Sequence, residues 1–132
     1  TGVFDLSPMN KYRISGPDAV QFLDRMMTRN MHKLAIDRVA YVVWCNDAGQ
    51  LMDDGTVFRL AENEYRLCSY ARANDWLYWC SLGFDVTITA ETAAGASLAC
   101  QGPTSCSPLT AMGLEGLEDL KPFDIRNYKF EK

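Results

Sequence analysis

The sequence has little of what metal centres and histidine-dependent hydrolases require. It contains one histidine, His32, and no two cysteines in a Cys-x-x-Cys spacing. We therefore expect neither a histidine-based catalytic triad nor a zinc site, and we place His32 on the surface. The cysteines are odd in number and scattered through apolar runs, which predicts free thiols that fill the core in a reducing compartment. They are Cys45, Cys68, Cys80, Cys100 and Cys106.

Long apolar runs and an excess of positive charge are also missing. No stretch approaches the roughly 18 continuous apolar residues of a membrane span. The N-terminus lacks the basic-then-apolar layout of a signal peptide. The net charge is -4, and no run of Lys or Arg alternates with aromatics, which argues against nucleic acid as a partner. The expectation is a cytoplasmic protein without membrane or nucleic-acid partners.

The chain does have the material for an ordinary core. Its 132 residues, 48% of them hydrophobic, suit a single domain over residues 1–132. Hydrophobic periodicity changes repeatedly and predicts an α+β fold, with a mostly antiparallel sheet and helices packed on one face. Helices are expected after Gly16-Pro17-Asp18, around the apolar face Trp76, Leu77, Trp79 and Cys80, and from Leu109. Strands are expected at the end of Phe4–Ser15, where Tyr12 and Ile14 share one face and Lys11 and Arg13 the other, and at Tyr41–Cys45, Thr56–Leu60, Tyr65–Tyr70, Asp85–Thr89, Ala96–Cys100 and Phe123–Phe130.

Two adjacent carboxylates, Asp53 and Asp54, lie in the predicted hairpin from Tyr41 to Leu60. Aspartate is uncommon in strands because its side chain competes for backbone hydrogen bonds. One interpretation is a bulge in which Gly55 adopts a conformation closed to other residues and both carboxylates face water. The other is that strand alternation turns one carboxylate to solvent and one into a cavity, as a general acid or base. The pattern leaves both open.

Three segments carry a resemblance to a known family. They are GVFDLSPMNKYRISGPDAVQFLDRMMTRNM, YVVWCNDAGQLMDDGTVFRL and LACQGPTS. In this order the sequence resembles the amino-terminal portion of the folate-dependent aminomethyltransferases, which include the glycine-cleavage T-protein, demethylases, and the C-terminal domains of dimethylglycine and sarcosine dehydrogenases. The resemblance implies part of the folate-binding domain of a T-protein-like fold, tetrahydrofolate as the cofactor, and a remainder in a longer chain.

The resemblance also implies site residues. Asp54 corresponds to the catalytic aspartate, and Tyr41 to a tyrosine that lines the same pocket. Ser69 stands where a folate-contacting asparagine is common, and Tyr70 follows it. The implied cofactor-binding residues are thus Tyr41, Asp54, Ser69 and Tyr70, with no metal. The implied partners are a small methyl or aminomethyl donor and, as a candidate, a lipoylated carrier protein.

Departures from the family pattern leave three functions open. Gly55 follows the paired aspartates where T-proteins have leucine, and Ser69 replaces the asparagine. The first function is aminomethyl transfer of the glycine-cleavage type. The second is folate-dependent demethylation of a methylated sulfur, oxygen or nitrogen compound, and the third is a non-catalytic folate-binding or interaction domain.

Overall fold

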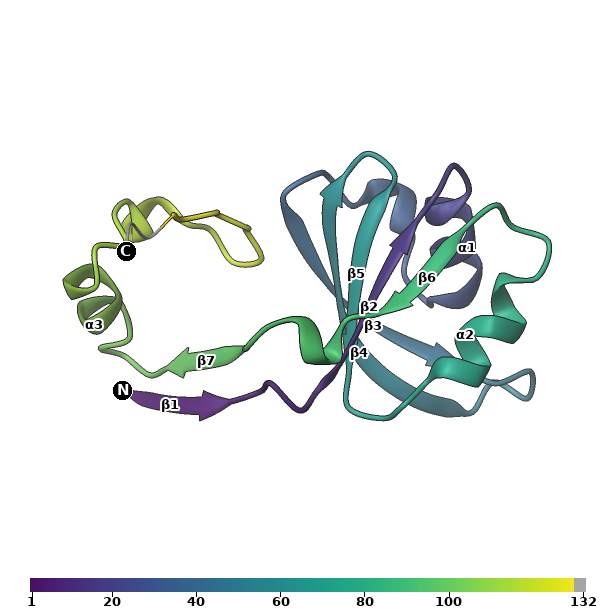
Figure 1. The fold of residues 1–132 in the computed structure, drawn as a ribbon, viewed down its shortest axis with the longest axis horizontal. Helices are drawn as coiled ribbons and strands as arrows, with labels where there is room; N and C mark the ends of the chain where they lie inside the picture. Colours follow the sequence, from purple (N-terminus) through teal and green to yellow (C-terminus); the bar gives the residue numbers. More distant parts are fainter. Residues whose placement is uncertain (130–132) are drawn as a thin grey trace.

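A computed structural model describes residues 1–129 and arranges them as two antiparallel sheets with short helices (Figure 1). The larger sheet has the order β3-β4-β5-β2-β6. Its strands are β2 (Asn10–Ser15), β3 (Arg38–Cys45), β4 (Leu51–Ala61), β5 (Glu64–Ser69) and β6 (Thr87–Ala90), and the smaller sheet pairs β1 (Gly2–Asp5) with β7 (Leu98–Gln101). The helices are α1 (Ala19–Met26), α2 (Asn74–Ser81) and α3 (Cys106–Ala111), with 3-10 turns at Met31–Lys33, Thr92–Ala94 and Leu117–Asp119. The predicted α+β class is confirmed. None of the helices described is long and apolar enough to cross a membrane.

One face of the larger sheet carries the core. Residues alternate along each strand, so Tyr12 and Ile14 of β2 are buried together on the side of α1 and α2. From α1, Phe22 and Leu23 pack against them and are fully buried. Burying each such side chain contributes roughly 1.5–3 kcal/mol. We call this side the helix-side face.

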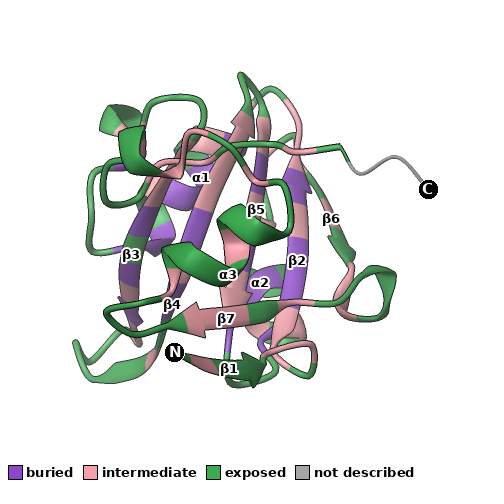
Figure 2. Cartoon of the chain, turned by 90° about the vertical axis from the view of Figure 1, so that its left-hand side faces the viewer, coloured by how far each residue is buried: buried purple, intermediate pink, exposed green. Residues whose placement is uncertain are grey.

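The other face of the larger sheet looks toward an arm made of β1, β7 and α3 (Figures 1 and 2). The arm is closed by pairing of Gly2 with Gln101 and by a hydrogen bond of 2.8 Å from the Leu6 amide to the Ser97 carbonyl. We call this side the arm-side face. Its residues alternate with those of the core and, apart from the buried Lys11, are less buried. They include Lys11, Arg13, Tyr41, Asp54, Thr56, Phe58, Arg66 and Cys68.

The predicted strand Phe123–Phe130 is wrong over the residues that the structure describes. Only a single bridge joins Asp124 to Arg38 at the edge of β3, and these two residues also form an ion pair. Phe123 and Asp37 both have positive φ, 68° and 59°, which breaks the extended geometry that a longer ladder requires. Phe130 lies outside the described residues.

Helix α2 buries less of its aromatic surface than its sequence suggested. The predicted apolar face of this helix is Trp76, Leu77, Trp79 and Cys80. Trp76 and Cys80 pack against the core, whereas Trp79 is 65% exposed, and the neighbouring Tyr78 is 59% exposed. Leu77 is the fully buried residue of this helix. Trp79 lies two positions further on, about 200° around the helix axis, and so faces away.

The cysteines and the histidine are more accessible than core residues. All five cysteines are free, four are partly buried and Cys106 is exposed. The prediction that the cysteines fill the core is therefore wrong, because none of them is fully buried. His32 is on the surface as expected, with 53% of its side chain exposed.

Candidate functional site

Strand β4 begins early enough to include both aspartates. Trp44 pairs with Asp53 and Val43 with Asp54, while Met52 is the extra residue of a β-bulge. Successive residues of a strand face opposite sides. Asp53 shares the helix-side face with Trp44 and accepts a hydrogen bond of 3.1 Å from the Ala71 amide. Asp53 therefore anchors the chain that leaves β5.

Asp54 lies on the arm-side face and is held by Tyr41. The Tyr41 hydroxyl donates a hydrogen bond of 2.6 Å to Oδ2 of Asp54. Among the described residues, Oδ1 of Asp54 receives no hydrogen bond. Both side chains are exposed. The two carboxylates thus separate as alternation predicts, with Asp53 used by the fold and Asp54 available to a ligand.

Gly55 has a different role from the one the bulge interpretation assigned to it. Its φ is not positive, and the bulge lies at Met52. Gly55 is buried, and a Cβ at this position would collide with the Cys68 carbonyl oxygen of β5. The glycine therefore allows β4 and β5 to approach closely directly beside Asp54.

An open pocket of about 230 Å³ surrounds the Tyr41–Asp54 pair. Tyr70 follows β5 and is 84% exposed, so its ring forms an accessible flat wall. Small-molecule sites usually measure about 300–1,000 Å³, so this pocket is smaller than an ordinary small-molecule site. The lining residues are Met9, Tyr41, Asp54, Gly55, Thr56, Cys68 and Tyr70.

Ser69 is the one predicted cofactor-binding residue that does not reach this pocket. It is fully buried on the helix-side face, and its hydroxyl donates a hydrogen bond of 3.1 Å to the Ala71 carbonyl. The structure thus brings Tyr41, Asp54 and Tyr70 together on the arm-side face and places Ser69 on the helix-side face.

Three lining residues were not singled out from the sequence: Met9, Thr56 and Cys68. Thr56 and Cys68 form a cross-strand pair on the arm-side face. They are next to the buried residues Val57 and Leu67 in their strands, so strand periodicity could have placed both on the arm-side face. Met9 lies in the turn before β2 and has no comparable signal.

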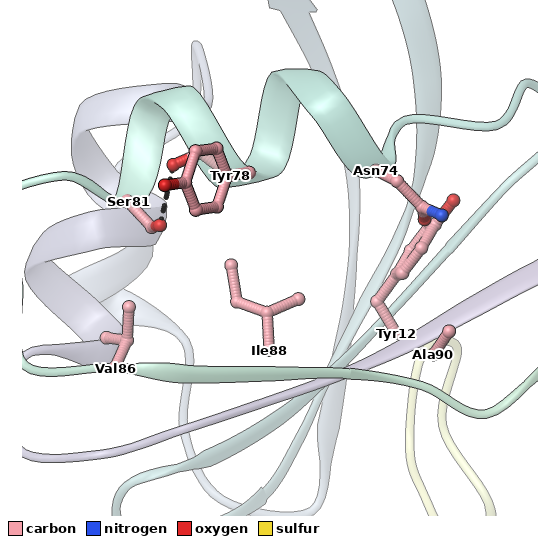
Figure 3. A pocket seen from close by; sticks show the side chains of 7 residues that line it. All are labelled: Tyr12, Asn74, Tyr78, Ser81, Val86, Ile88 and Ala90. Carbon is pink, nitrogen blue, oxygen red and sulfur yellow. Dashed lines mark hydrogen bonds between the residues drawn. The ribbon is translucent and has the colours of Figure 1, made fainter.

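A second cavity, of about 380 Å³, lies between α2 and β6 (Figure 3). Its side chains are mostly apolar or neutral, and the Tyr12 hydroxyl already accepts a hydrogen bond of 2.9 Å from the Ala73 amide. The Ser81 hydroxyl likewise donates to the Tyr78 carbonyl. No carboxylate or cation lines this cavity, so the Asp54 pocket is the better candidate for chemistry.

The Tyr41–Asp54 contact predicts a measurable titration. The hydrogen bond to Asp54, assisted by partial desolvation and by the carboxylate charge, raises the pKa of the Tyr41 phenol, so the phenol stays protonated to higher pH than an ordinary tyrosine. Asp54→Asn removes the charge, and we expect Tyr41 to ionise at lower pH. Phenolate absorbance during alkaline titration, after subtraction of a matching Tyr41→Phe background, isolates this group. Asp53→Asn is the control, and an unchanged Tyr41 titration in Asp54→Asn would contradict the contact.

Comparison with known proteins now identifies the family. The GCVT N-terminal domain profile matches residues 1–131. The chain belongs to the GCVT N-terminal domain family. Among its relatives, the aminomethyltransferase of Lysinibacillus sphaericus is 32% identical over 133 residues, covering 98% of this chain and 34% of that protein. The aminomethyltransferase of Deinococcus deserti is 38% identical over 112 residues, covering 82% of this chain and 31% of that protein.

A solved structure supports the same conclusion for the fold of this GCVT N-terminal domain. The glycine cleavage system aminomethyltransferase T from Bartonella henselae superposes with a TM-score of 0.78 at 27% identity, covering 93% of this chain and 34% of that one. The predicted resemblance to a T-protein-like fold is confirmed. The chain spans about a third of the length of the curated relatives it matches.

Proposed function

We propose that this chain is the tetrahydrofolate-binding amino-terminal part, a single domain over residues 1–132, of a longer one-carbon transferase. The observation that carries the proposal is the Asp54 carboxylate, fixed by Tyr41 through one oxygen and accessible through the other. Membership of the GCVT N-terminal domain family and the aminomethyltransferase relatives support it. Within this function, Asp54 is the proposed catalytic residue.

The residues of the pocket fit a reduced pterin. A pterin is flat and carries ring N–H groups, so it needs an aromatic wall and a hydrogen-bond acceptor. The exposed ring of Tyr70 and Oδ1 of Asp54 provide these on one side. The small volume of the pocket means that the opposite side comes from elsewhere in the longer protein. We therefore assign pterin contacts to Tyr41, Asp54 and Tyr70, and no contact to the Ser69 side chain.

The chemistry divides between the cofactor and the chain. Tetrahydrofolate supplies a ring nitrogen that accepts the one-carbon unit. Asp54 stabilises positive charge beside that nitrogen and accepts its proton. Tyr41 keeps the carboxylate in one orientation through its hydrogen bond of 2.6 Å. A fixed carboxylate needs no reorganisation as charge develops, which is the source of its effect on the rate.

Two kinds of one-carbon donor remain compatible with this pocket. One is an aminomethyl group on a lipoylated carrier, as in glycine cleavage. The other is a methylated sulfur, oxygen or nitrogen compound, which the glycine after Asp54 favours. A folate-binding domain without catalysis is the remaining candidate, and the accessible carboxylate argues against it.

A turnover screen tests the function. The protein is prepared in its full natural length and incubated with aminomethyl and methyl donors, with and without tetrahydrofolate. We expect a one-carbon folate product with at least one donor class and none without tetrahydrofolate. Binding of tetrahydrofolate without turnover by any donor would move the protein to the non-catalytic class. Absence of binding would overturn the proposal.

A further inference from the structure

The two edges of the larger sheet differ in whether the chain covers them. At the β3 edge, the Val39 amide donates a hydrogen bond of 2.8 Å to the Phe123 carbonyl. The Ile125 amide donates a second, of 2.9 Å, to the Asp37 carbonyl, so the segment around Phe123 covers this edge. The other edge is β6, which pairs only with β2 in the part of the chain that the structure describes (Figure 2). The edge at β6 is therefore open.

The outer side of β6 presents the backbone groups of Ile88 and Ala90. The Glu91 amide donates a hydrogen bond of 2.7 Å to the Lys11 carbonyl, so the backbone of Glu91 faces β2. In an antiparallel pair, every second residue bonds to a given neighbour. The backbone of Thr89 therefore also faces β2, whereas Ile88 and Ala90 face outward. Their N–H and C=O groups form no hydrogen bond within residues 1–129 and are free to pair with another strand.

Strand β6 lacks the charge and the proline with which natural proteins often protect an edge strand. It reads Thr-Ile-Thr-Ala. Its pairing with β2 is regular from Thr87 to Ala90, without a bulge. Because unpaired edges otherwise recruit further strands, exposed edge strands commonly carry lysine, proline or a bulge. With four residues, β6 is suited to accept one short additional strand.

A cavity beside this edge can receive a side chain of the added strand. Ile88 and Ala90, the two residues whose backbone faces outward, line the cavity of about 380 Å³ between α2 and β6. Figure 3 shows these two side chains on one side of the open space and α2 on the other. Residues that lie opposite each other in paired strands have their side chains on the same face. A residue opposite Ile88 therefore has its side chain at this cavity, whose apolar and neutral lining selects an apolar group.

The start of β6 carries negative charge without a partner. Asp85 is exposed, and its carboxylate forms no ion pair or hydrogen bond with a described residue. Asp18 accepts a hydrogen bond of 2.8 Å from the Asp85 amide, which brings a second carboxylate to this end of the strand. Arg25 lies over the Phe84 ring, 5.9 Å from its centre, and pairs with neither carboxylate. At the other end of β6, Glu91 is already bonded to two arginines. An antiparallel strand on β6 points its carboxyl end toward Asp85, so a basic residue there is complementary.

We propose that β6 binds an extended peptide segment of a partner protein, which adds an antiparallel strand to the larger sheet. An apolar side chain opposite Ile88 occupies the cavity beneath α2, and a basic residue near the carboxyl end of the peptide pairs with Asp85. Main-chain hydrogen bonds to Ile88 and Ala90 supply affinity, whereas the cavity and Asp85 supply selectivity. The site lies at the edge and the helix-side face of the sheet, away from Asp54, and is independent of the function proposed above.

A designed peptide tests the proposal. The peptide Ser-Val-Thr-Phe-Thr-Gln-Lys, with fluorescein at its amino end and an amide at its carboxyl end, is titrated with the full-length protein while fluorescence polarisation is recorded. Its valine lies opposite Ala90, its phenylalanine opposite Ile88 and its lysine near Asp85. Replacing the phenylalanine by serine should weaken binding about tenfold, because an apolar side chain no longer fills the cavity. Replacing the central threonine, on the other face, by serine should have little effect.

Methylation of single peptide nitrogens tests the strand pairing itself. N-methylation of the phenylalanine, whose N–H faces β6, should weaken binding about fivefold or more, because a main-chain hydrogen bond is lost. N-methylation of the preceding threonine, whose N–H faces away, should change the affinity no more than about twofold. Absence of peptide binding, or equal losses from the two methylations, would overturn the proposal. These comparisons change only the ligand, so protein folding does not affect them.

Ala90→Pro and Ala90→Ser make the same test in the protein. Proline removes an N–H that faces outward, so no hydrogen bond to β2 is lost and the edge strand tolerates it. We expect Ala90→Pro to bind the peptide about fivefold or more weakly and Ala90→Ser to bind it as wild type does, with urea unfolding as the check that both fold. Asp85→Asn should weaken binding at low salt and have little effect at high salt. Unchanged binding in a folded Ala90→Pro protein would contradict the proposal.

Other occupants of this edge give distinct results. If a second copy of the chain fills it, sedimentation of the wild-type protein shows a dimer that Ala90→Pro dissociates. If another segment of the longer protein fills it, the full-length protein binds no peptide. Either result would overturn the proposal of a partner peptide.

Discussion

Replacing Asp54 by asparagine is expected to lower folate-dependent turnover by about 10²- to 10³-fold, the effect of removing a positioned acid or base or a fixed electrostatic group. Asparagine keeps the size of the side chain and an oxygen that accepts the Tyr41 hydrogen bond. It removes the charge that stabilises a cationic centre. Because Asp54 is exposed and outside the core, the variant should fold normally, and the loss should appear in kcat more than in KM.

Asp53→Asn is the matched control for this experiment. Asp53 is the adjacent residue on β4, faces the other side of the sheet, and accepts a hydrogen bond from the Ala71 amide. Turnover in this variant should remain within a few-fold of wild type. Equal losses in the two variants, or full activity in Asp54→Asn, would show that the chemistry does not depend on the carboxylate of the arm-side face.

Gly55→Ala is expected to destabilise the protein by about 1–3 kcal/mol, the usual cost of forcing additional atoms into a packed site. A Cβ at Gly55 collides with the Cys68 carbonyl oxygen. This is backbone, and it cannot move without parting β4 from β5. The shift would also displace Asp54, so turnover should fall together with stability. Urea unfolding measures the free energy of unfolding directly.

Gly95→Ala provides the comparison for this substitution. Gly95 has extended backbone with φ near -172°, and a Cβ there meets no atom within 4 Å. Gly95→Ala should change the free energy of unfolding by no more than about 0.5 kcal/mol, as other surface substitutions do. If Gly55→Ala unfolds at the same urea concentration as Gly95→Ala, the close approach of β4 and β5 is not what requires glycine.

The central hairpin shows what strand periodicity alone predicts correctly. The apolar run at Tyr41–Cys45 and the β-rich run at Thr56–Leu60 lie in β3 and β4 as expected. Alternation also separates Asp53 from Asp54, one on each face. The same rule applied to β5 places Ser69 with the buried residues Tyr65 and Leu67. Strand alternation could therefore have predicted that Ser69 does not line the pocket.

Strand periodicity could not predict which segments far apart in the chain pair with each other. Strands β1 and β7 have four residues each, and their paired residues Gly2 and Gln101 lie 99 positions apart in the chain. Neither has an alternation strong enough to identify its partner. The cluster of Glu91 with Arg13 and Arg66 likewise joins β2, β5 and the turn after β6. A single sequence gives no register for three separate segments, so this cluster appears only in the folded chain.

The location of the folate site is the central claim, and a comparison of two exposed tyrosines tests it most directly. Tyr70 lines the Asp54 pocket, whereas Tyr78 lies on α2 behind the sheet, and both are largely exposed. Calorimetry should give tetrahydrofolate binding about tenfold weaker in Tyr70→Ser, because an aromatic contact is lost. Tyr78→Ser should bind as wild type does. Unchanged affinity in Tyr70→Ser, or a larger loss in Tyr78→Ser, would contradict the assignment of the pocket.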